Sequence, residues 1–376
     1  MKDTDTGFTI KNIGFIGFGL IGGSIARAIK NTHPDIFIYA YDYHEASSNN
    51  DYQDAMADGV LDYVTKDLAV GFSKCDIIFL CAPVKANISY LEKLKPIIKP
   101  TCIITDVGSV KSNIHEAVKN LSMEELFIGG HPMTGSEKTG YHYSYALLLE
   151  NAYYILTPTD KTSLSSINLL GDLVKDIGSI PIILDPKEHD EITAAISHLP
   201  HIIAAQLVNL VRDSDDVSQR MKQLAAGGFK DITRIASSSP TMWQNICITN
   251  SKIIKKILDK YIKYLQDTSD ALSNMNDNYL YNIFDTAGEY RNSIPSKSVG
   301  LINRIFEIYV DIMDEAGAIA TIATLLAGNQ ISIKNIGIIH NREFEEGVLR
   351  IEFYDEESVQ GANTLLSKHN YRIYER

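Results

Sequence analysis

The first half of the chain alternates short apolar runs with stretches whose apolar residues recur every three or four positions. The runs are NIGFIG, IFIYAYD, DIIFLCAP, CIITDVG, AYYILTP and PIILD, all between residues 12 and 185. Apolar strands that alternate with helices are typical of a parallel sheet covered on both faces. The pattern therefore predicts an α/β domain over residues 10–186, with a Rossmann-type doubly wound parallel sheet.

The periodicity changes twice after this domain. Residues 187–292 carry apolar side chains at helical spacing, as in KEHDEITAAISHLPHIIAAQLVNLV, and predict an all-helical second domain. The polar stretch YRNSIPSKS at 290–298 is typical of a linker. Residues 299–376 then follow the order strand, helix, strand, strand, helix, strand, which predicts a ferredoxin-like α+β domain.

Composition and charge narrow the classes of partner. The 376 residues carry 35 basic and 47 acidic side chains, a net charge of −12, which disfavours nucleic acid or an anionic membrane as the main partner. The polar start MKDTDTGFTIKN and the absence of an uninterrupted apolar run of about 18 residues predict a cytoplasmic protein. The four cysteines form no C-x-x-C pair, and we interpret them as reduced thiols.

The first apolar run leads into a glycine-rich segment and then a helical pattern. A G-x-G-x-x-G sequence between strand and helix is the fingerprint of a dinucleotide site, with the phosphates at the helix N-terminus. Asp42 lies twenty residues after the last of these glycines, where a carboxylate binds an adenosine ribose and repels a 2′-phosphate. We therefore expect NAD as the cofactor. The predicted cofactor residues are Gly17, Gly19, Leu20, Ile21, Gly22, Asp42, Pro83 and Ser109.

One histidine lies in a segment that favours neither helix nor strand. His131 stands between a glycine pair and a proline in IGGHPMTGSEKTG, a setting typical of a turn. Pro83 and Ser109 follow the fourth and fifth apolar runs. Ligands bind at the carboxyl ends of strands in a doubly wound sheet, so we expect Ser109 and His131 at the edge of the cleft.

The helical half adds further polar candidates. Ser197, His198 and His201 lie on one helix face in ISHLPH, where Pro200 is expected to kink the helix. These histidines suit polar ligand contacts better than zinc, because no Glu or Cys cluster accompanies them; two solvent-facing histidines are the alternative. In GGFKDITRIASSSPTMW, an Asp231-held Arg234 could clamp a carboxylate, although a surface ion pair has the same spacing. The single tryptophan, Trp243, lies nearby.

In combination these motifs resemble the prephenate dehydrogenases of tyrosine biosynthesis that carry a C-terminal ACT domain. The matching segments are GFGLIGGSIARAI, DVGSVK, GGHPMTGSEKTG, SHLPH, GGFKDITRIA and MW, in the family's order. The resemblance implies NAD-dependent oxidative decarboxylation of prephenate to 4-hydroxyphenylpyruvate by a homodimer, with no metal. It implies His131 as the catalytic histidine, assisted by Ser109. It also implies substrate or site contacts from Ser197, His198, His201, Arg234, Asp231, Glu137 and Trp243.

The C-terminal domain departs from the ACT pattern at its ligand turn. This turn often has the sequence Pro-Gly-Ala but here is Ala316-Gly317-Ala318, and Ser332 replaces an Asn common before the second strand. By resemblance, Gly317, Ala318 and Ser332 are the effector-site candidates and tyrosine the expected inhibitor. Arogenate dehydrogenase, a 3-hydroxyacid-type dehydrogenase and an inactive amino-acid-sensing regulatory protein remain alternatives.

Overall fold

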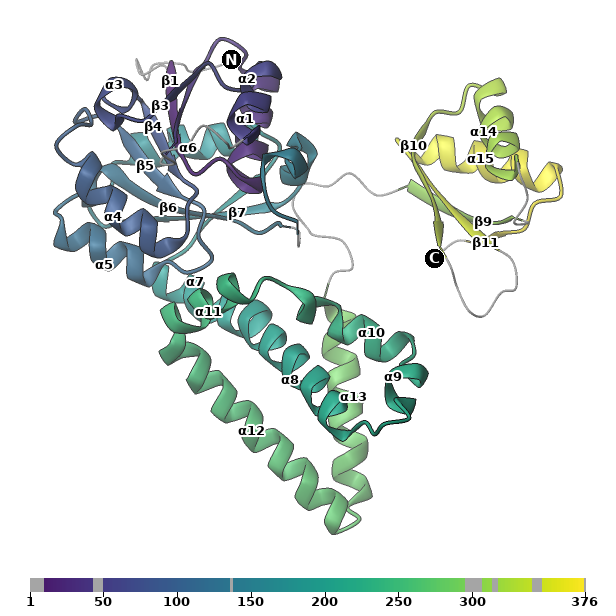
Figure 1. The fold of residues 1–376 in the computed structure, drawn as a ribbon. Coiled ribbons are helices and arrows are strands. Elements are labelled where there is room, and N and C mark those ends of the chain that lie inside the picture. Colours follow the sequence, from purple (N-terminus) through teal and green to yellow (C-terminus); the bar gives the residue numbers. More distant parts are fainter. Residues whose placement is uncertain are drawn as a thin grey trace. The chain divides into compact units, whose positions relative to one another are not determined.

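The computed structural model describes residues 10–42, 50–135, 138–294, 306–312, 317–339 and 347–374. The chain divides into two compact units, Met1–Ile294 and Pro295–Arg376 (Figure 1). The first unit contains an α/β region followed by a helical region, and the second contains a small sheet with two helices. The predicted succession of fold classes is therefore confirmed.

The α/β region is built on an eight-stranded sheet in the order β3-β2-β1-β4-β5-β6-β7-β8. The strands are β1 (Asn12–Ile16), β2 (Phe37–Tyr41), β3 (Tyr63–Thr65), β4 (Ile77–Leu80), β5 (Ile103–Asp106), β6 (Phe127–Pro132), β7 (Tyr153–Pro158) and β8 (Ile180–Ile183). The helices are α1 (Leu20–Thr32), α2 (Asn50–Ala57), α3 (Leu68–Phe72), α4 (Val84–Leu94), α5 (Ser112–Asn120) and α6 (Leu164–Asp176). Short 3-10 turns are η1 (Glu124–Leu126), η2 (Tyr141–Tyr143) and η3 (Ala146–Leu149).

Successive residues of the central strands belong to two different cores. In β4, Ile77 and Phe79 pack with α1, α2 and α6, whereas Ile78 and Leu80 pack with α3, α4 and α5. Because side chains alternate between the faces of a strand, a strand buried on both faces must be apolar throughout. This requirement explains the uninterrupted apolar runs.

Two details of the sheet differ from the prediction. β7 pairs antiparallel with β6, whereas the other neighbouring strands are parallel, so the sheet is mixed. His131 does not lie in a turn, because Phe127–Pro132 forms strand β6 and His131 pairs with Ile155 of β7. A Cβ on Gly129 would lie 2.3 Å from the Thr157 hydroxyl, and one on Gly130 would lie 2.4 Å from the Asp106 carbonyl oxygen. The glycine pair thus marks close packing on both faces of a strand rather than a turn.

The helical region begins with one continuous helix from Pro186 to Ser214. Its parts are α7 (Pro186–Thr193), the π-helical turn η4 (Ala194–His198) and α8 (Leu199–Ser214). Pro200 lies inside this continuous helix, directly after the π-helical turn. The remaining elements are α9 (Arg220–Leu224), α10 (Gly227–Thr233), η5 (Arg234–Ser237), α11 (Pro240–Thr249), α12 (Ser251–Ser273) and α13 (Asp277–Ser293).

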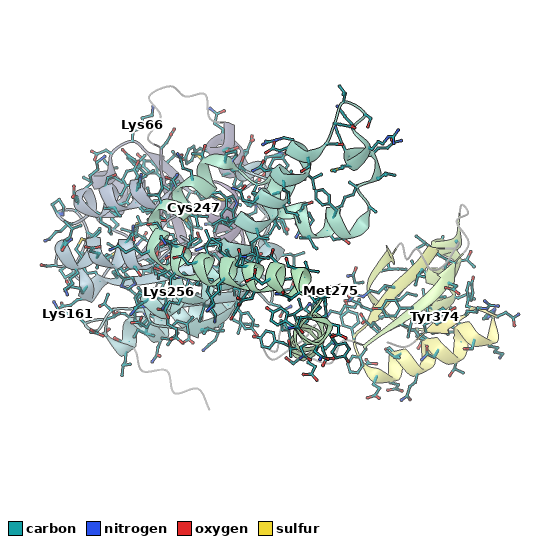
Figure 2. The ribbon with its side chains drawn as sticks, turned by 90° about the horizontal axis from the view of Figure 1, so that it is seen from below. Lys66, Lys161, Cys247, Lys256, Met275 and Tyr374 are labelled. Carbon is teal, nitrogen blue, oxygen red and sulfur yellow. The ribbon has the colours of Figure 1, made fainter. Side chains whose placement is uncertain are left out.

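The helices α12 and α13 pack against each other and expose much apolar surface. Met275, in the turn between them, is 86% exposed (Figure 2). α13 continues to Ser293, so the start of the predicted linker at 290–293 is helical instead. Its polar residues lie on an exposed helix, which explains why composition alone was misleading.

The C-terminal unit has a four-stranded antiparallel sheet in the order β10-β11-β9-β12. Its elements are β9 (Phe306–Ile312), α14 (Ala318–Gly328), β10 (Ile333–Ile339), β11 (Gly347–Phe353), α15 (Glu356–Lys368) and β12 (Ile373–Tyr374). Ile322 and Leu326 of α14 and Leu366 of α15 are buried with the sheet. The succession and the strand order are those of the predicted ferredoxin-like unit.

Candidate active site

The glycine-rich loop has the backbone that a dinucleotide site requires. Gly17 has φ +89°, and a Cβ on Gly22 would lie 2.6 Å from the Gly17 carbonyl oxygen, so these positions exclude larger residues. By contrast, nothing lies within 4 Å of a Cβ built on Gly19. Gly19 caps α1, which Leu20 and Ile21 begin, and no side chain caps its N–H groups. Open space at uncapped helical N–H groups fits a pyrophosphate.

The other predicted cofactor residues lie at the carboxyl ends of neighbouring strands. Asp42 directly follows β2 and is largely buried. Pro83 follows β4 as the N-cap residue of α4. Ser109 lies half-buried in the loop between β5 and α5. Since β2, β1, β4 and β5 are consecutive in the sheet, these residues line one edge of it.

A buried ion pair supports the loop that carries Ser109. Lys111 donates from Nζ to Asp106 Oδ2 and to the Gly130 carbonyl oxygen, the latter at 2.7 Å. Asp106 also accepts hydrogen bonds from the backbone N–H groups of Gly108, at 2.9 Å, and Gly130, at 3.1 Å. Both side chains of the ion pair are 0% exposed. The pair therefore joins the β5–α5 loop to the backbone immediately before His131.

The ring of His131 contacts a residue that the sequence motifs did not indicate. His131 Nδ1 lies 2.8 Å from His189 Nε2, and His189 Nδ1 lies 2.9 Å from Asp190 Oδ1. Asp190 also accepts hydrogen bonds from the backbone N–H groups of Lys111, at 2.7 Å, and Ser112, at 2.8 Å. Both His189 and Asp190 are fully buried on α7. Ring nitrogen Nδ1 of His131 is thus paired with His189 rather than with Ser109.

Burial decides the charge of these groups. It lowers the pKa of His131 well below the ordinary histidine value, and the nearby His189 and Lys111 lower it further. Burial alone would raise the pKa of Asp190, but hydrogen bonds from His189 and Ser112 outweigh it and lower that pKa. Near neutral pH the site therefore combines an uncharged His131 with an ionised Asp190.

The π-helical turn and α8 present the second group of histidines. His198 is 1% exposed and His201 is half-buried, so neither faces solvent freely. His201 stacks on Trp243, with ring centroids 3.8 Å apart, and its Nδ1 contacts the Ser197 carbonyl oxygen at 2.9 Å. Burial and a nearby Asp190 act in opposite directions on His198, and burial prevails to lower its pKa to about 4. His198 is therefore an uncharged, buried imidazole.

Asn250 determines which nitrogen of His198 carries the proton. Asn250 Nδ2 donates to the Asp190 carbonyl oxygen at 3.0 Å, which identifies it as the amide nitrogen. The same nitrogen lies 3.2 Å from His198 Nδ1, so Nδ1 accepts and Nε2 carries the hydrogen. Among the residues that the structure describes, Nε2 of the buried His198 has no hydrogen-bond partner, and Trp243 Nε1 is in the same state. Buried donors without partners suit a bound ligand that offers acceptors.

The expected Asp231–Arg234 clamp is not formed. Both side chains are exposed, and the ion pairs within the described ranges do not include one between them. Asp231 lies in α10 and Arg234 lies in the 3-10 turn η5, so the two residues do not share one regular helix. Arg234 nevertheless lies close enough to His201 to lower its pKa, after burial, which has the larger effect. Glu137 lies outside the described residues.

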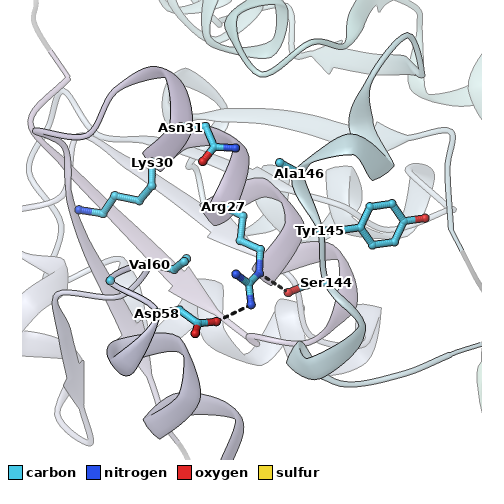
Figure 3. A pocket seen from close by; sticks show the side chains of 9 residues that line it. Arg27, Lys30, Asn31, Asp58, Val60, Ser144, Tyr145 and Ala146 are labelled. Carbon is cyan, nitrogen blue, oxygen red and sulfur yellow. Dashed lines mark hydrogen bonds and ion pairs between the residues drawn. The ribbon is translucent and has the colours of Figure 1, made fainter. Parts of the chain in front are cut away.

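A hollow elsewhere in the α/β region is not part of this site. It has a volume of about 350 Å³ and lies beside α1 and the segment 144–146 (Figure 3). Its cations are already paired: Arg27 contacts Asp58 at 2.6 Å, and Lys30 contacts Asp62 at 2.7 Å. Such paired charges offer little to an anionic ligand. Over the described part of the chain, no cluster of three or more His, Cys, Asp or Glu side chains suits a metal ion.

Sequence reasoning missed Lys111, His189, Asp190 and Asn250, which support the predicted residues. One available signal was helical spacing. Counting back from Ser197 in steps of four reaches Thr193 and His189, and these positions share one face of the helix. The lysine of DVGSVK and the asparagine of CITN gave no comparable signal, because their partners are remote in sequence.

Comparisons with known proteins agree along almost the whole chain. Residues 25–183 match the nucleotide-binding domain of prephenate dehydrogenase, and residues 185–286 match its dimerization domain. The prephenate dehydrogenase of Bacillus subtilis is 38% identical over 96% of this chain and 95% of its own length. That of Lactococcus lactis is 34% identical over 96% of this chain and 98% of its own.

A solved structure gives the same result. Prephenate dehydrogenase from A. aeolicus, in complex with hydroxyphenyl propionate and NAD+, aligns with a TM-score of 0.71 at 29% identity. The alignment covers 77% of this chain and 100% of that chain. Motif order, fold and relatives agree, and the chain belongs to the prephenate dehydrogenase family.

Proposed function

We propose that this protein is an NAD-dependent prephenate dehydrogenase that oxidises and decarboxylates prephenate to 4-hydroxyphenylpyruvate. The observation that carries the proposal is His131, a half-buried and uncharged imidazole held by His189 at the carboxyl end of β6. It lies on the same edge of the sheet as the glycine-rich loop. His198 and Trp243, both in the helical region, add buried donors.

His131 supplies general base catalysis in this proposal. NAD would be held at the glycine-rich loop of Gly17, Gly19 and Gly22 and would supply the acceptor for a hydride from the ring carbon that bears the hydroxyl. As the hydride leaves, the hydroxyl proton passes to His131 and the C–O bond becomes a carbonyl. The bond between the ring and its carboxylate then breaks, carbon dioxide leaves, and the released electron pair makes the ring aromatic. His131 returns the proton to the oxygen, so protons balance.

The remaining residues bind and orient the substrate. His198 donates from Nε2 to an acceptor oxygen, and Ser109 and Ser197 offer hydroxyl groups at the cleft. Arg234 binds a carboxylate of the substrate near His201 and Trp243. We assign Glu137 to the mouth of the site, as a support for Arg234.

Absorbance of NADH with prephenate and arogenate as substrates tests this function directly. Purified protein is expected to reduce NAD with prephenate, and the arogenate arm distinguishes the two substrates, which share the ring. His131→Asn should still bind NAD but lose roughly 10²- to 10⁴-fold in kcat, the usual contribution of general acid-base catalysis. No reduction with either substrate would favour a regulatory protein, and near-normal kcat in the variant would remove His131 from the mechanism.

We further propose that the chain has three domains, at residues 10–186, 187–292 and 299–376. The third is an ACT domain that senses tyrosine. Gly317 has φ +99°, caps α14 without a side-chain contact and has nothing within 4 Å of its Cβ position. This leaves the N–H groups of Ala318 and the following residues open to a carboxylate. Ser332 lies exposed just before β10, and Ala316 lies outside the described residues.

Calorimetry on the full chain tests this sensor. Tyrosine should release or absorb heat at up to millimolar concentration, and its binding should weaken substrate or cofactor binding reciprocally if the coupling acts on affinity. No heat with tyrosine or phenylalanine would leave the domain with a role in assembly only.

We propose a homodimer formed through the helical region, and a cytoplasmic location. The helix Pro186–Ser214 is long and apolar enough to cross a membrane by length and composition. However, it carries His189, Asp190 and His198 in buried contacts with other parts of the unit. Its exposed apolar residues, with those of α12 and α13, suit a second copy of the chain. Light scattering that gives a monomer mass would exclude the dimer.

A further inference from the structure

The buried pair His189–Asp190 has no role in the family motifs quoted above, yet it contacts the proposed catalytic base directly. The three groups form a chain in which Asp190 contacts His189 at 2.9 Å and His189 contacts His131 at 2.8 Å. The centroids of the His131 and His189 rings lie 5.1 Å apart, and the ring planes make an angle of 71°. This geometry suits in-plane hydrogen bonding from one ring to the other.

The direction of each hydrogen bond among these three side chains follows from the charge of Asp190. Asp190 accepts from two backbone N–H groups, one on each carboxylate oxygen, and these hydrogen bonds help to keep it ionised. An ionised carboxylate can only accept, so His189 Nδ1 must carry a hydrogen. A neutral His189 then has a lone pair on Nε2, and the hydrogen of the 2.8 Å contact belongs to His131 Nδ1.

From this geometry, and on the basis of the proposed function, we propose that Asp190 and His189 are positioning residues that hold His131 in its Nδ1–H tautomer. This tautomer leaves the lone pair of His131 on Nε2, the nitrogen that points away from His189. Nε2 can therefore accept the hydroxyl proton while Nδ1 keeps its partner. His189 and Asp190 thus fix both the orientation of the His131 ring and the nitrogen of that ring that reacts.

The same contacts stabilise the protonated form of His131 during the reaction. When Nε2 takes the hydroxyl proton, the hydrogen bond from Nδ1 to His189 becomes charge-assisted and stronger. The negative charge of Asp190 lies behind it, and no proton has to move along the chain. The other ionisable groups facing this region are Lys111, Asp106 and His198. Lys111 and Asp106 pair with each other, so Asp190 is the carboxylate that contacts His189.

Nitrogen NMR on protein with ¹⁵N-labelled histidine tests the tautomer without substrate or cofactor. His131→Asn identifies the His131 signals by their loss. In the wild-type protein we expect a protonated Nδ1 and an unprotonated Nε2 on His131. His189→Leu should lose this preference, because Nδ1 then has no acceptor. A protonated Nε2 on wild-type His131 would overturn the proposal, since it would mean that His189 donates to His131.

Two substitutions at His189 separate positioning from simple support of the fold. The carboxamide of His189→Gln can still accept from His131 and donate to Asp190, whereas His189→Leu can do neither. We expect kcat to fall roughly 10²-fold or more in the leucine variant, as when a base loses its orientation, with partial rescue in the glutamine variant. The KM for NAD should change little in either.

A matched control is another histidine–carboxylate pair. His33 Nε2 contacts Asp176 Oδ2 at 2.8 Å at the surface, far from this chemistry in the sequence. His33→Leu should leave kcat and the His131 signals unchanged. Equal kcat losses in His189→Gln and His189→Leu, with the wild-type tautomer retained in both, would reduce His189 to a structural residue. Failure of the parent protein to reduce NAD would instead refute the proposed function, and the NMR result would still stand.

Discussion

Lys111→Met would remove a positive charge from the interior of the α/β region. Asp106 would then keep its carboxylate in a site that is 0% exposed, with only the backbone N–H groups of Gly108 and Gly130 as described donors to it. The Gly130 carbonyl oxygen would also lose its 2.7 Å hydrogen bond from Nζ. Breaking a buried pair on one side costs about 3–5 kcal/mol, because an uncompensated charge remains. We expect a loss of this size in the free energy of unfolding.

Urea unfolding followed by circular dichroism measures this loss. Lys175→Met is the control, because Lys175 pairs with Asp172 at 2.9 Å and both side chains are mostly exposed. The unfolding midpoint of this variant should hardly differ from that of the parent protein. The double variant Asp106→Asn/Lys111→Met should be more stable than the sum of the single losses implies, by about 0.5–3 kcal/mol. A Lys111→Met midpoint no lower than that of the control, or strict additivity in the double variant, would refute the reasoning.

Three further outcomes follow from the site. Asp42→Ser should narrow the preference for NAD over NADP, because repulsion of a 2′-phosphate is relieved; an unchanged ratio of kcat/KM values would argue against it. Arg234→Lys should weaken substrate binding by roughly 1.5–3 kcal/mol, since the guanidinium fork is lost, whereas the surface control Arg212→Lys should leave KM unaltered. Because burial lowers the pKa of His131, kcat/KM should hold through pH 6.5 and fall only at lower pH; an acid limb above 6.5 would contradict this.

Local patterns predicted the elements of this fold well. Burial on both faces made the central strands apolar throughout, and helical spacing marked the second region. The predictions of an α/β region and of a helical region were therefore confirmed. The glycine pair before His131 was misleading because its small size serves close packing against Thr157 and Asp106, which lie far away in sequence. Glycine in a sequence indicates that space is short or that φ is positive, and only the fold decides which.

The supporting contacts of the site were harder to predict for a related reason. Asp190 reaches backbone N–H groups 78 and 79 residues away, and a polar KEHDE segment at a helix start is typical of solvated surface. Nothing local distinguishes a buried Asp190 from an exposed one. The glycine-rich loop was predictable because all the residues that define it lie within one strand, turn and helix.

The strand location of His131 has a consequence for changes in chain length. Residues of a strand alternate between its faces, and β6 is held in register by β5 on one side and β7 on the other. Inserting or deleting one residue between Phe127 and His131 would turn the imidazole to the opposite face of the sheet, away from His189. An indel of odd length in this segment would therefore abolish the site, and Gly129 and Gly130 also limit the exchange of side chains, because neither position has room for a Cβ.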